Sequence, residues 1–252
     1  VVHVSNEGQR FAFALPPAYE EVDSELIIMS KDSVNVTVRF PNSIVEEVDV
    51  GAGNVTYFSL AGKVSRTIVD LEDKGVTISA PSPISVYLTN SETTDVRNPD
   101  STILRPIDAD DIDDVFIMSY TPGPNSAQEQ WSPKGFFMVV AAANSGETDV
   151  EVWSIQEDGD YILEREATLF SNQVLTANEW EIGTGQERDY TGTMIRSTQP
   201  VAVYAGHGCA KLPYTVDDFQ TRYVFESMPR SSEYGTSFST NSLHFGEQGG
   251  YV

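Results

Sequence analysis

The chain is poor in cysteine and histidine, and each shortage removes a class of function. Its 252 residues include one cysteine, Cys209, and three histidines, and a single thiol excludes an intrachain disulfide. There is no HExxH, no CxxC and no glycine-rich phosphate loop, so metal hydrolases and nucleotide-binding enzymes are not expected. No apolar run approaches the roughly 18 residues that a membrane-spanning helix needs, so we expect no membrane insertion.

Basic side chains are also scarce. Lys and Arg number 15 against 38 Asp and Glu, which gives a formal net charge of −23. Such a field repels phosphate backbones and anionic lipid, so we expect no nucleic acid partner. It favours solubility and is compatible with a calcium-rich exterior. The start at Val1, without a signal peptide or initiating Met, indicates a processed product or part of a longer chain.

One stretch of the sequence occurs twice. Residues Gly75–Asn90 read GVTISAPSPISVYLTN, and residues Gly192–His207 read GTMIRSTQPVAVYAGH, at a constant offset of 117 (75 to 192). Each copy contains an apolar-alternating segment, a proline-bearing turn, and a second alternating segment ending in Val-Tyr. Self-similarity at a fixed period predicts two copies of one β-unit.

The rest of the sequence also alternates with a period of two. Short segments rich in Val, Ile, Thr, Phe and Tyr are separated by Gly, Pro, Asn, Asp and Ser clusters, and no window has a capped helical period, so helices should be few. We expect strands near residues 10–15, 25–29, 34–40, 44–50, 55–60, 76–79, 84–89, 115–121, 136–142, 149–153, 161–166, 193–197, 201–205 and 221–225. This pattern predicts an all-β fold with two tandem β-sandwich, jelly-roll-like units. A propeller is the alternative, although its blades are shorter than this period.

The boundary between the units is expected within residues 90–114, which mix Pro, Asn, Ser, Thr and Asp. We therefore divide the chain into a first unit at residues 1–103 and a second at residues 104–230. Residues 225–238 are similar to residues 104–116. We therefore expect residues 231–252 to be the start of a third unit, or a terminal strand used in assembly.

Five stretches resemble one known family. They are GQRFAFALPP at Gly8–Pro17, ISVYLTN at Ile84–Asn90, LRPIDADDIDDVFIMSY at Leu104–Tyr120, PVAVYAGHGCAKLP at Pro200–Pro213 and ESMPRSSEYGTSF at Glu226–Phe238. In this order they resemble the N-terminal domain of the IgGFc-binding protein family, a β-rich module of secreted mucin-associated and adhesion proteins.

The chain departs from the family pattern at two places. The family pairs the cysteine at the Cys209 position with a second one, which would fall near Thr221 here, and its Trp-Gly appears as Tyr234-Gly235. The resemblance implies an extracellular, non-enzymatic module of adhesive, mucus or matrix proteins. It does not identify a ligand.

The densest acidic cluster lies at the expected boundary between the units. Calcium takes six to eight oxygen ligands, and five clustered carboxylates could supply several of them. The run does not fit an EF-hand, because Ile112 stands at a ligand position and no Gly follows. The alternative is a charged loop that keeps sheet edges from pairing wrongly. The candidate calcium ligands are Asp108, Asp110, Asp111, Asp113 and Asp114.

Four other residues are candidates for modification or contact. Asn35 and Asn54 stand in N-x-T sequons, and strict alternation in residues 34–40 places Asn35 on the wet face of a strand. Cys209, two residues after His207, is a small buried thiol, an intermolecular disulfide or a catalytic nucleophile, the last lacking an identifiable third partner. Trp131, in the Pro- and Gly-punctuated stretch 121–135, either contacts a ligand or caps the end of the core.

From these features we expect a non-enzymatic structural or adhesion module that mediates protein–protein cohesion in a matrix, mucus or filament assembly. Its partners would be other protein subunits, neighbouring copies of the same module or glycans. We expect no cofactor apart from a candidate calcium ion, and an extracellular or cell-surface location. The alternatives are a calcium-dependent carbohydrate-binding module, with Trp131 and the acidic cluster near its site, and a hydrolase that uses a pair of carboxylates.

Overall fold

The structure is a computed structural model. It describes residues 6–16, 22–67, 69–92, 100–107, 112–118, 135–142, 146–178, 189–211, 221–235, 243–244 and 250–251. In these ranges the fold is all-β, with three antiparallel sheets and one short hairpin. The helical content of the described ranges is two three-residue 3-10 turns, Pro41–Ser43 and Ser231–Glu233. The prediction of an all-β fold with few helices is confirmed.

Sheet A is formed by the N-terminal part of the chain and has seven strands. Its order is β4-β3-β7-β2-β5, with β1 and β8 also paired to β7. The strands are β1 (Glu7–Phe13), β2 (Val22–Ser30), β3 (Val34–Arg39), β4 (Val45–Val50), β5 (Val55–Ser59), β7 (Val76–Glu92) and β8 (Asp100–Ile103).

Sheets B and C contain the later strands. Sheet B has the order β16-β15-β10-β13-β6, and sheet C has the order β12-β11-β14-β9. The strands of sheet B are β6 (Leu71–Asp73), β10 (Gly135–Ala141), β13 (Gln173–Asn178), β15 (Val201–Lys211) and β16 (Thr221–Ser227). Those of sheet C are β9 (Val115–Phe116), β11 (Thr148–Ile155), β12 (Tyr161–Leu169) and β14 (Met194–Ser197). Near the C-terminus, β17 (Leu243–His244) pairs with β18 (Gly250–Tyr251).

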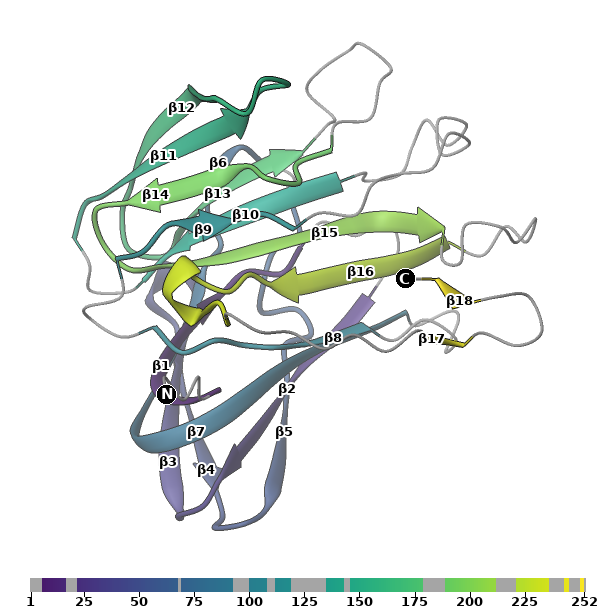
Figure 1. Ribbon diagram of the computed structural model, residues 1–252. Coiled ribbons are helices and arrows are strands. Elements are labelled where there is room, and N and C mark those ends of the chain that lie inside the picture. The colour runs from purple at the N-terminus through teal and green to yellow at the C-terminus, as the bar shows by residue number, and fades with distance from the viewer. Residues whose placement is uncertain are drawn as a thin grey trace.

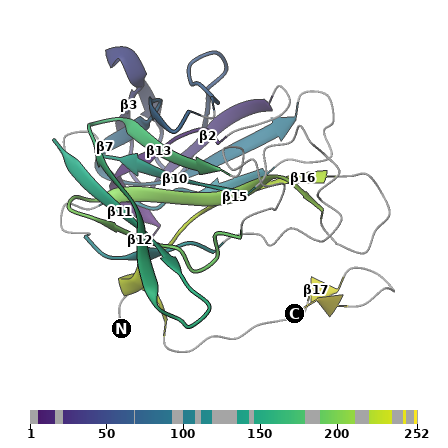
Figure 2. The same ribbon diagram turned by 90° about the horizontal axis from the view of Figure 1, so that it is seen from above.

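The three sheets lie one above another, with sheet B in the middle (Figure 1). Seen from above, the β11–β12 hairpin of sheet C runs across β10 and β15 of sheet B (Figure 2). Side chains of β10 alternate between two hydrophobic cores: Phe136, Met138 and Val140 pack in the core shared with sheet A, whereas Phe137 and Val139 pack in the core shared with sheet C. Burial on both faces explains why β10 reads as a continuous apolar run, GFFMVVA.

The contact between sheets A and B was not predicted from the sequence. The core of sheet A is completed by side chains of sheet B, among them Tyr204 and Phe225. The N-terminal and C-terminal halves are therefore packed directly against each other. Neither half has all of its buried apolar surface within its own strands.

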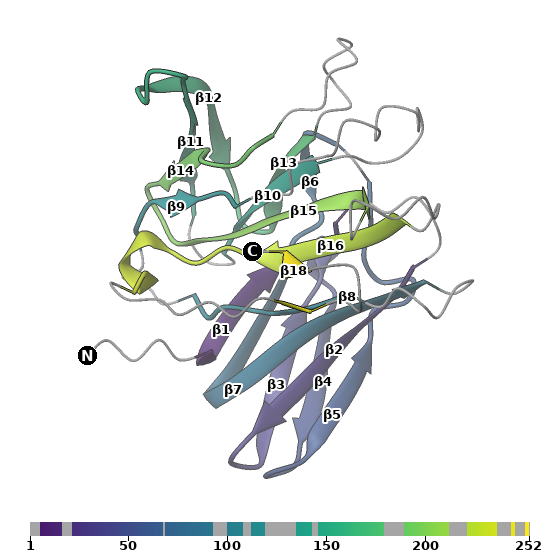
Figure 3. The ribbon, with the colours of Figure 1, turned by 45° about the vertical axis from the view of Figure 1, so that its right-hand side comes forward.

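The proline-bearing turn predicted in the first repeat is wrong. Strand β7 continues from Val76 to Glu92 and extends across sheet A (Figure 3). Pro81 and Pro83 are tolerated because the ladder is interrupted beside them: β3 pairs with β7 only as far as Ser79, and β2 pairs with it from Ile84 onward. In the second repeat the chain does break, since β14 lies in sheet C and β15 in sheet B.

Candidate functional site

The contact between sheets A and B is centred on Tyr204. Its side chain is fully buried, its hydroxyl donates to the carbonyl oxygen of Ala12 at 2.7 Å, and its ring stacks on Phe225 at 5.2 Å between centroids. Burial raises the pKa of the Tyr204 hydroxyl above its usual range. The Tyr204 hydroxyl therefore stays neutral, and its hydrogen bond to Ala12 satisfies the one polar group that this side chain buries.

Polar groups of β8 and β16 extend this joint. The Thr102 hydroxyl donates to the Glu226 carboxylate at 2.8 Å and accepts the Ser227 backbone N–H at 3.1 Å. Nearby, burial raises the pKa of Asp100 to about 6, and the negative charge of Glu226 adds to the shift. The joint therefore holds two carboxylates close together, and protonation of Asp100 in mild acid favours the folded state.

A buried lysine lies where the chain passes from β6 into β7. Lys74 has no exposed surface, its Nζ donates to the Thr67 carbonyl oxygen at 2.6 Å, and burial lowers its pKa to about 8. The next residue, Gly75, donates its N–H to the carbonyl oxygen of Asn172 at 2.8 Å. A Cβ at Gly75 would lie 2.7 Å from that oxygen, so only glycine allows the two backbones to approach so closely.

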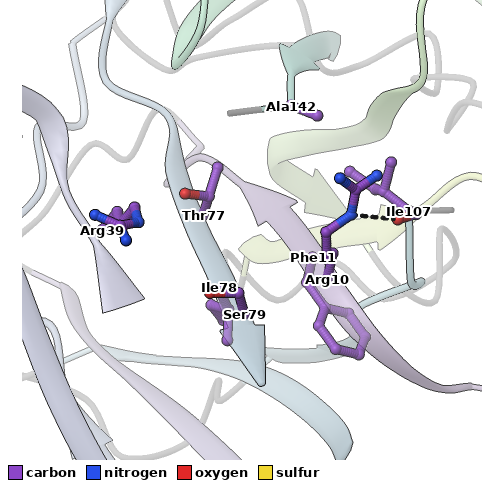
Figure 4. A pocket seen from close by; sticks show the side chains of 8 residues that line it. All are labelled: Arg10, Phe11, Arg39, Thr77, Ile78, Ser79, Ile107 and Ala142. Carbon is purple, nitrogen blue, oxygen red and sulfur yellow. Dashed lines mark hydrogen bonds between the residues drawn. The ribbon is translucent and has the colours of Figure 1, made fainter. Parts of the chain in front are cut away.

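A small cavity lies beside the same joint (Figure 4). Arg10 and Arg39 flank β7 on either side, and Ala142, which follows β10, closes the cavity. Arg10 Nε donates to the Ile107 carbonyl oxygen at 3.4 Å. The cavity volume is about 40 Å³, which holds a few water molecules but not an organic substrate.

A second, more open hollow of about 320 Å³ lies at the end of sheet A. Its lining includes Met29, Ser85 and the sequon residue Asn54, with the exposed Glu7–Lys31 ion pair (2.9 Å) at its rim. A glycan on Asn54 would therefore stand at the edge of the outer face of sheet A. The other sequon residue, Asn35, is exposed on β3 as expected, and its Nδ2 donates to Asp49 at 3.0 Å.

The predicted calcium cluster is only partly within the described residues. Asp108, Asp110 and Asp111 lie outside them. Asp114 forms a bidentate contact with Arg196, at 3.0 and 3.1 Å, so its carboxylate already has a cation. In the described part of the chain, no group of three or more His, Cys, Asp or Glu side chains could hold a metal ion. Calcium binding at this cluster stays a prediction.

The structure says less about the remaining candidates. Trp131 lies outside the described residues. Cys209 lies in β15, and its side chain is not described. His207 is buried in the same strand, with only 2% of its surface exposed. Exposed side chains that sequence reasoning missed lie elsewhere, on the outer faces of sheets A and C. Tyr57 is 63% exposed, and Tyr234 is 41% exposed.

These features define an all-β protein whose buried contacts join sheets to one another. Neither the cavity of about 40 Å³ nor the open hollow of about 320 Å³ combines the enclosure and convergent polar groups of a catalytic pocket. Residues 100–250 match the family model for IgGFc binding protein, and the chain belongs to this family. A comparison with curated protein sequences gives no match.

Family membership confirms the resemblance inferred from the sequence motifs. The IgGFc-binding domain is typical of secreted, mucin-like proteins, and the family is generally non-catalytic. No helix in the described ranges has the length and apolar character to cross a lipid bilayer.

Proposed function

We propose that this chain is a non-catalytic extracellular cohesion module made of two docked copies of one β-sandwich unit. The first unit consists of β1–β5, β7 and β8, and the second consists of β9–β16. Strand β6 comes from the N-terminal part of the chain but pairs with β13 of the second unit. The module holds protein subunits together in a matrix, mucus or filament assembly.

The strand pairings support the two-unit description. Residues that correspond in the repeated sequence have corresponding partners: Ile78 pairs with strands β3 and β1, and Ile195 pairs with strands β11 and β9. Likewise Tyr87 pairs with β2 and β8, and Tyr204 pairs with β10 and β16. The β3–β4 hairpin corresponds to β11–β12, and the β2–β5 pair corresponds to β10–β13.

Hydrogen bonds outside the ladders repeat in the same way. The Leu104 N–H donates to Val86 at 2.8 Å, and the Met228 N–H donates to Val203 at 2.8 Å. Three residues further along the chain, Ile107 donates to Arg10 at 2.8 Å and Ser231 donates to Asp114 at 2.9 Å. Val86 and Val203 are equivalent in the repeat, so the agreement extends to the connections that leave each unit.

The observation that carries the cohesive role is the joint around Tyr204. Here one copy of the unit recognises the other through a buried aromatic side chain, a backbone acceptor and the Thr102–Glu226 contact. A unit that docks onto its own copy within one chain already has the surfaces for docking in an array. The family's occurrence in mucin-like proteins agrees with this role.

Sedimentation velocity of the purified chain over a wide concentration range tests the proposal, with and without millimolar calcium. The proposal predicts reversible association that grows with concentration. A chain that stays monomeric at every concentration and calcium level contradicts it. Association that requires both calcium and added glycan would instead support the carbohydrate-binding alternative.

A further inference from the structure

The joint inside the chain uses one particular face of the second unit. On the face of sheet B that points toward sheet A, Met138 and Tyr204 are opposite each other across the ladder, and both are fully buried. The row continues to Thr176 on β13 and to Ser227 on β16. All four side chains are at most 9% exposed, because the first unit covers them.

The equivalent row in the first unit has no such cover within the described residues. Leu26, Ile28, Val86 and Leu88 point into the core, so the residues between them face outward. Register aligns the outward residues into one apolar row across four strands. We call it the head row: Tyr57, Ile27, Tyr87 and Ile103. Tyr57 is 63% exposed, and the other three are partly exposed.

Apolar rows on an outer sheet face are unusual where the face meets only water, since such positions normally carry polar residues. On one side the neighbouring row follows the usual pattern, with Ser59, Glu25, Thr89 and Ser101. On the other side Val55 and Met29 extend the apolar surface. The head row is therefore a candidate contact surface, since the first unit covers the equivalent row of the second unit.

The surface that receives the second unit also has an equivalent on sheet C. In the first unit, Ala12 and Thr77 pair across β1 and β7 and lie buried beside the joint, with exposures of 0% and 7%. Their equivalents on sheet C are Phe116 and Met194, and Met194 pairs in turn with Trp153. We call this the tail row: Trp153, Met194 and Phe116.

The tail row is surrounded by further aromatic side chains. Phe116 has Tyr161 and Tyr234 at 6.4 Å between ring centroids, and Arg196 lies 5.9 Å from the Trp153 ring. Phe116, Trp153 and Tyr161 are partly exposed, whereas Met194 between them is 8% exposed. Aromatic and Arg side chains are the residue types that contribute most at protein interfaces.

We propose that the head row of one molecule docks on the tail row of a second copy of this chain, through the same pair of faces that join its two units internally. This inference rests on the proposed cohesive function and names its surfaces. The two faces of such a contact differ, so molecules add head to tail, and a rotation that does not close gives an open filament. The charge of −23 opposes the contact, and association is stronger at high ionic strength.

Two measurements on the full chain test the inference. Sedimentation compares the unmodified chain with Tyr57→Ser/Tyr87→Ser, and with Phe170→Ser as a matched control, since Phe170 is 51% exposed but lies outside both rows. If the double variant misfolds by circular dichroism, Tyr57→Ser alone replaces it. In the second measurement, a photo-crosslinking amino acid at position 57 reports by mass spectrometry which surface it contacts.

The expected result is a loss in association constant of at least about tenfold for the head-row variant and less than about twofold for the control. Crosslinks from position 57 should reach peptides that contain Phe116 or Trp153. Association that the head-row variant leaves unchanged, or crosslinks between two head rows, overturns the inference and leaves cohesion standing. A chain that never associates overturns both.

Discussion

Equivalent tyrosines in the two repeats give the sharpest test of the internal joint. Tyr204 is fully buried and its hydroxyl donates to Ala12 at 2.7 Å, whereas Tyr87 is partly exposed on the outer face of sheet A. Replacing Tyr204 by Phe removes the hydroxyl and leaves the Ala12 carbonyl without that donor. A net hydrogen bond contributes about 1 kcal/mol, and a buried acceptor left unsatisfied costs about 1–3 kcal/mol.

We therefore expect Tyr204→Phe to lower the free energy of unfolding by about 1–2 kcal/mol, and Tyr87→Phe to change it by less than about 0.5 kcal/mol. Truncation widens the difference, since a buried aromatic replaced by Ala costs about 3–5 kcal/mol. Urea unfolding at neutral pH, followed by intrinsic fluorescence, measures each variant. Equal losses at positions 87 and 204 would refute the reasoning, because the two hydroxyls would then have equivalent surroundings.

Three further predictions concern the same region. Asp100→Asn should stabilise the chain at pH 7 by about 1 kcal/mol, after allowance for solvent screening, because a carboxyl whose pKa is raised to about 6 disfavours the folded state when ionised. In the unmodified chain, the contribution of Asp100 to the free energy of unfolding falls as pH rises from 3.8 to about 6. Denaturation at several pH values should show that Asp100→Asn lacks this pH dependence. Burial lowers the pKa of Lys74 to about 8, so the free energy of unfolding should rise between pH 8 and 10.5. Lys74→Met should abolish this rise. A rise that persists in the variant would show that Lys74 does not cause it. Gly206→Ala should destabilise by more than about 2 kcal/mol, since its Cβ would lie 2.1 Å from the Val224 oxygen. At the equivalent position of the first repeat, Thr89 is partly exposed and its hydroxyl donates to the Glu25 carbonyl oxygen at 3.2 Å. Thr89→Ala should therefore cost about 1 kcal/mol or less. Thermal unfolding measures both variants, and similar losses would count against the packing at Gly206.

Alternation of apolar residues was enough to predict most strands. Val34, Val36 and Val38 are buried on β3 with Asn35 exposed between them, as the pattern VNVTVR requires. Family membership could also be inferred, because several short motifs appear in a shared order. In contrast, β6, β8 and β13 were missed, since LED, DSTI and QVLTAN are short and weakly alternating.

The packing of the sheets could not be inferred from periodicity. A strand buried on both faces has a continuous apolar sequence, as GFFMVVA in β10 does. This sequence predicts a strand, but it does not show that alternate side chains enter two different cores. The continuity of β7 through Pro81 and Pro83 was also hidden, because proline normally ends a strand and only the partner registers explain why it is tolerated here.

The candidate contact residues were missed for a related reason. Tyr57 and Tyr87 lie in alternating strands, where a sequence cannot tell which face is covered by another sheet. The repeat identifies Tyr87 and Tyr204 as equivalent residues, but only the structure shows that Tyr204 is buried and Tyr87 is partly exposed. The difference arises because the first unit covers the face of the second unit that carries Tyr204.

Electron microscopy of the purified chain, at high concentration and elevated ionic strength, tests the central claim most directly. Each chain has one head row and one tail row available for contact. We therefore expect rods that lengthen with concentration, with one chain as the repeating element. Dispersed single particles at every concentration, or closed symmetric pairs, would contradict the account.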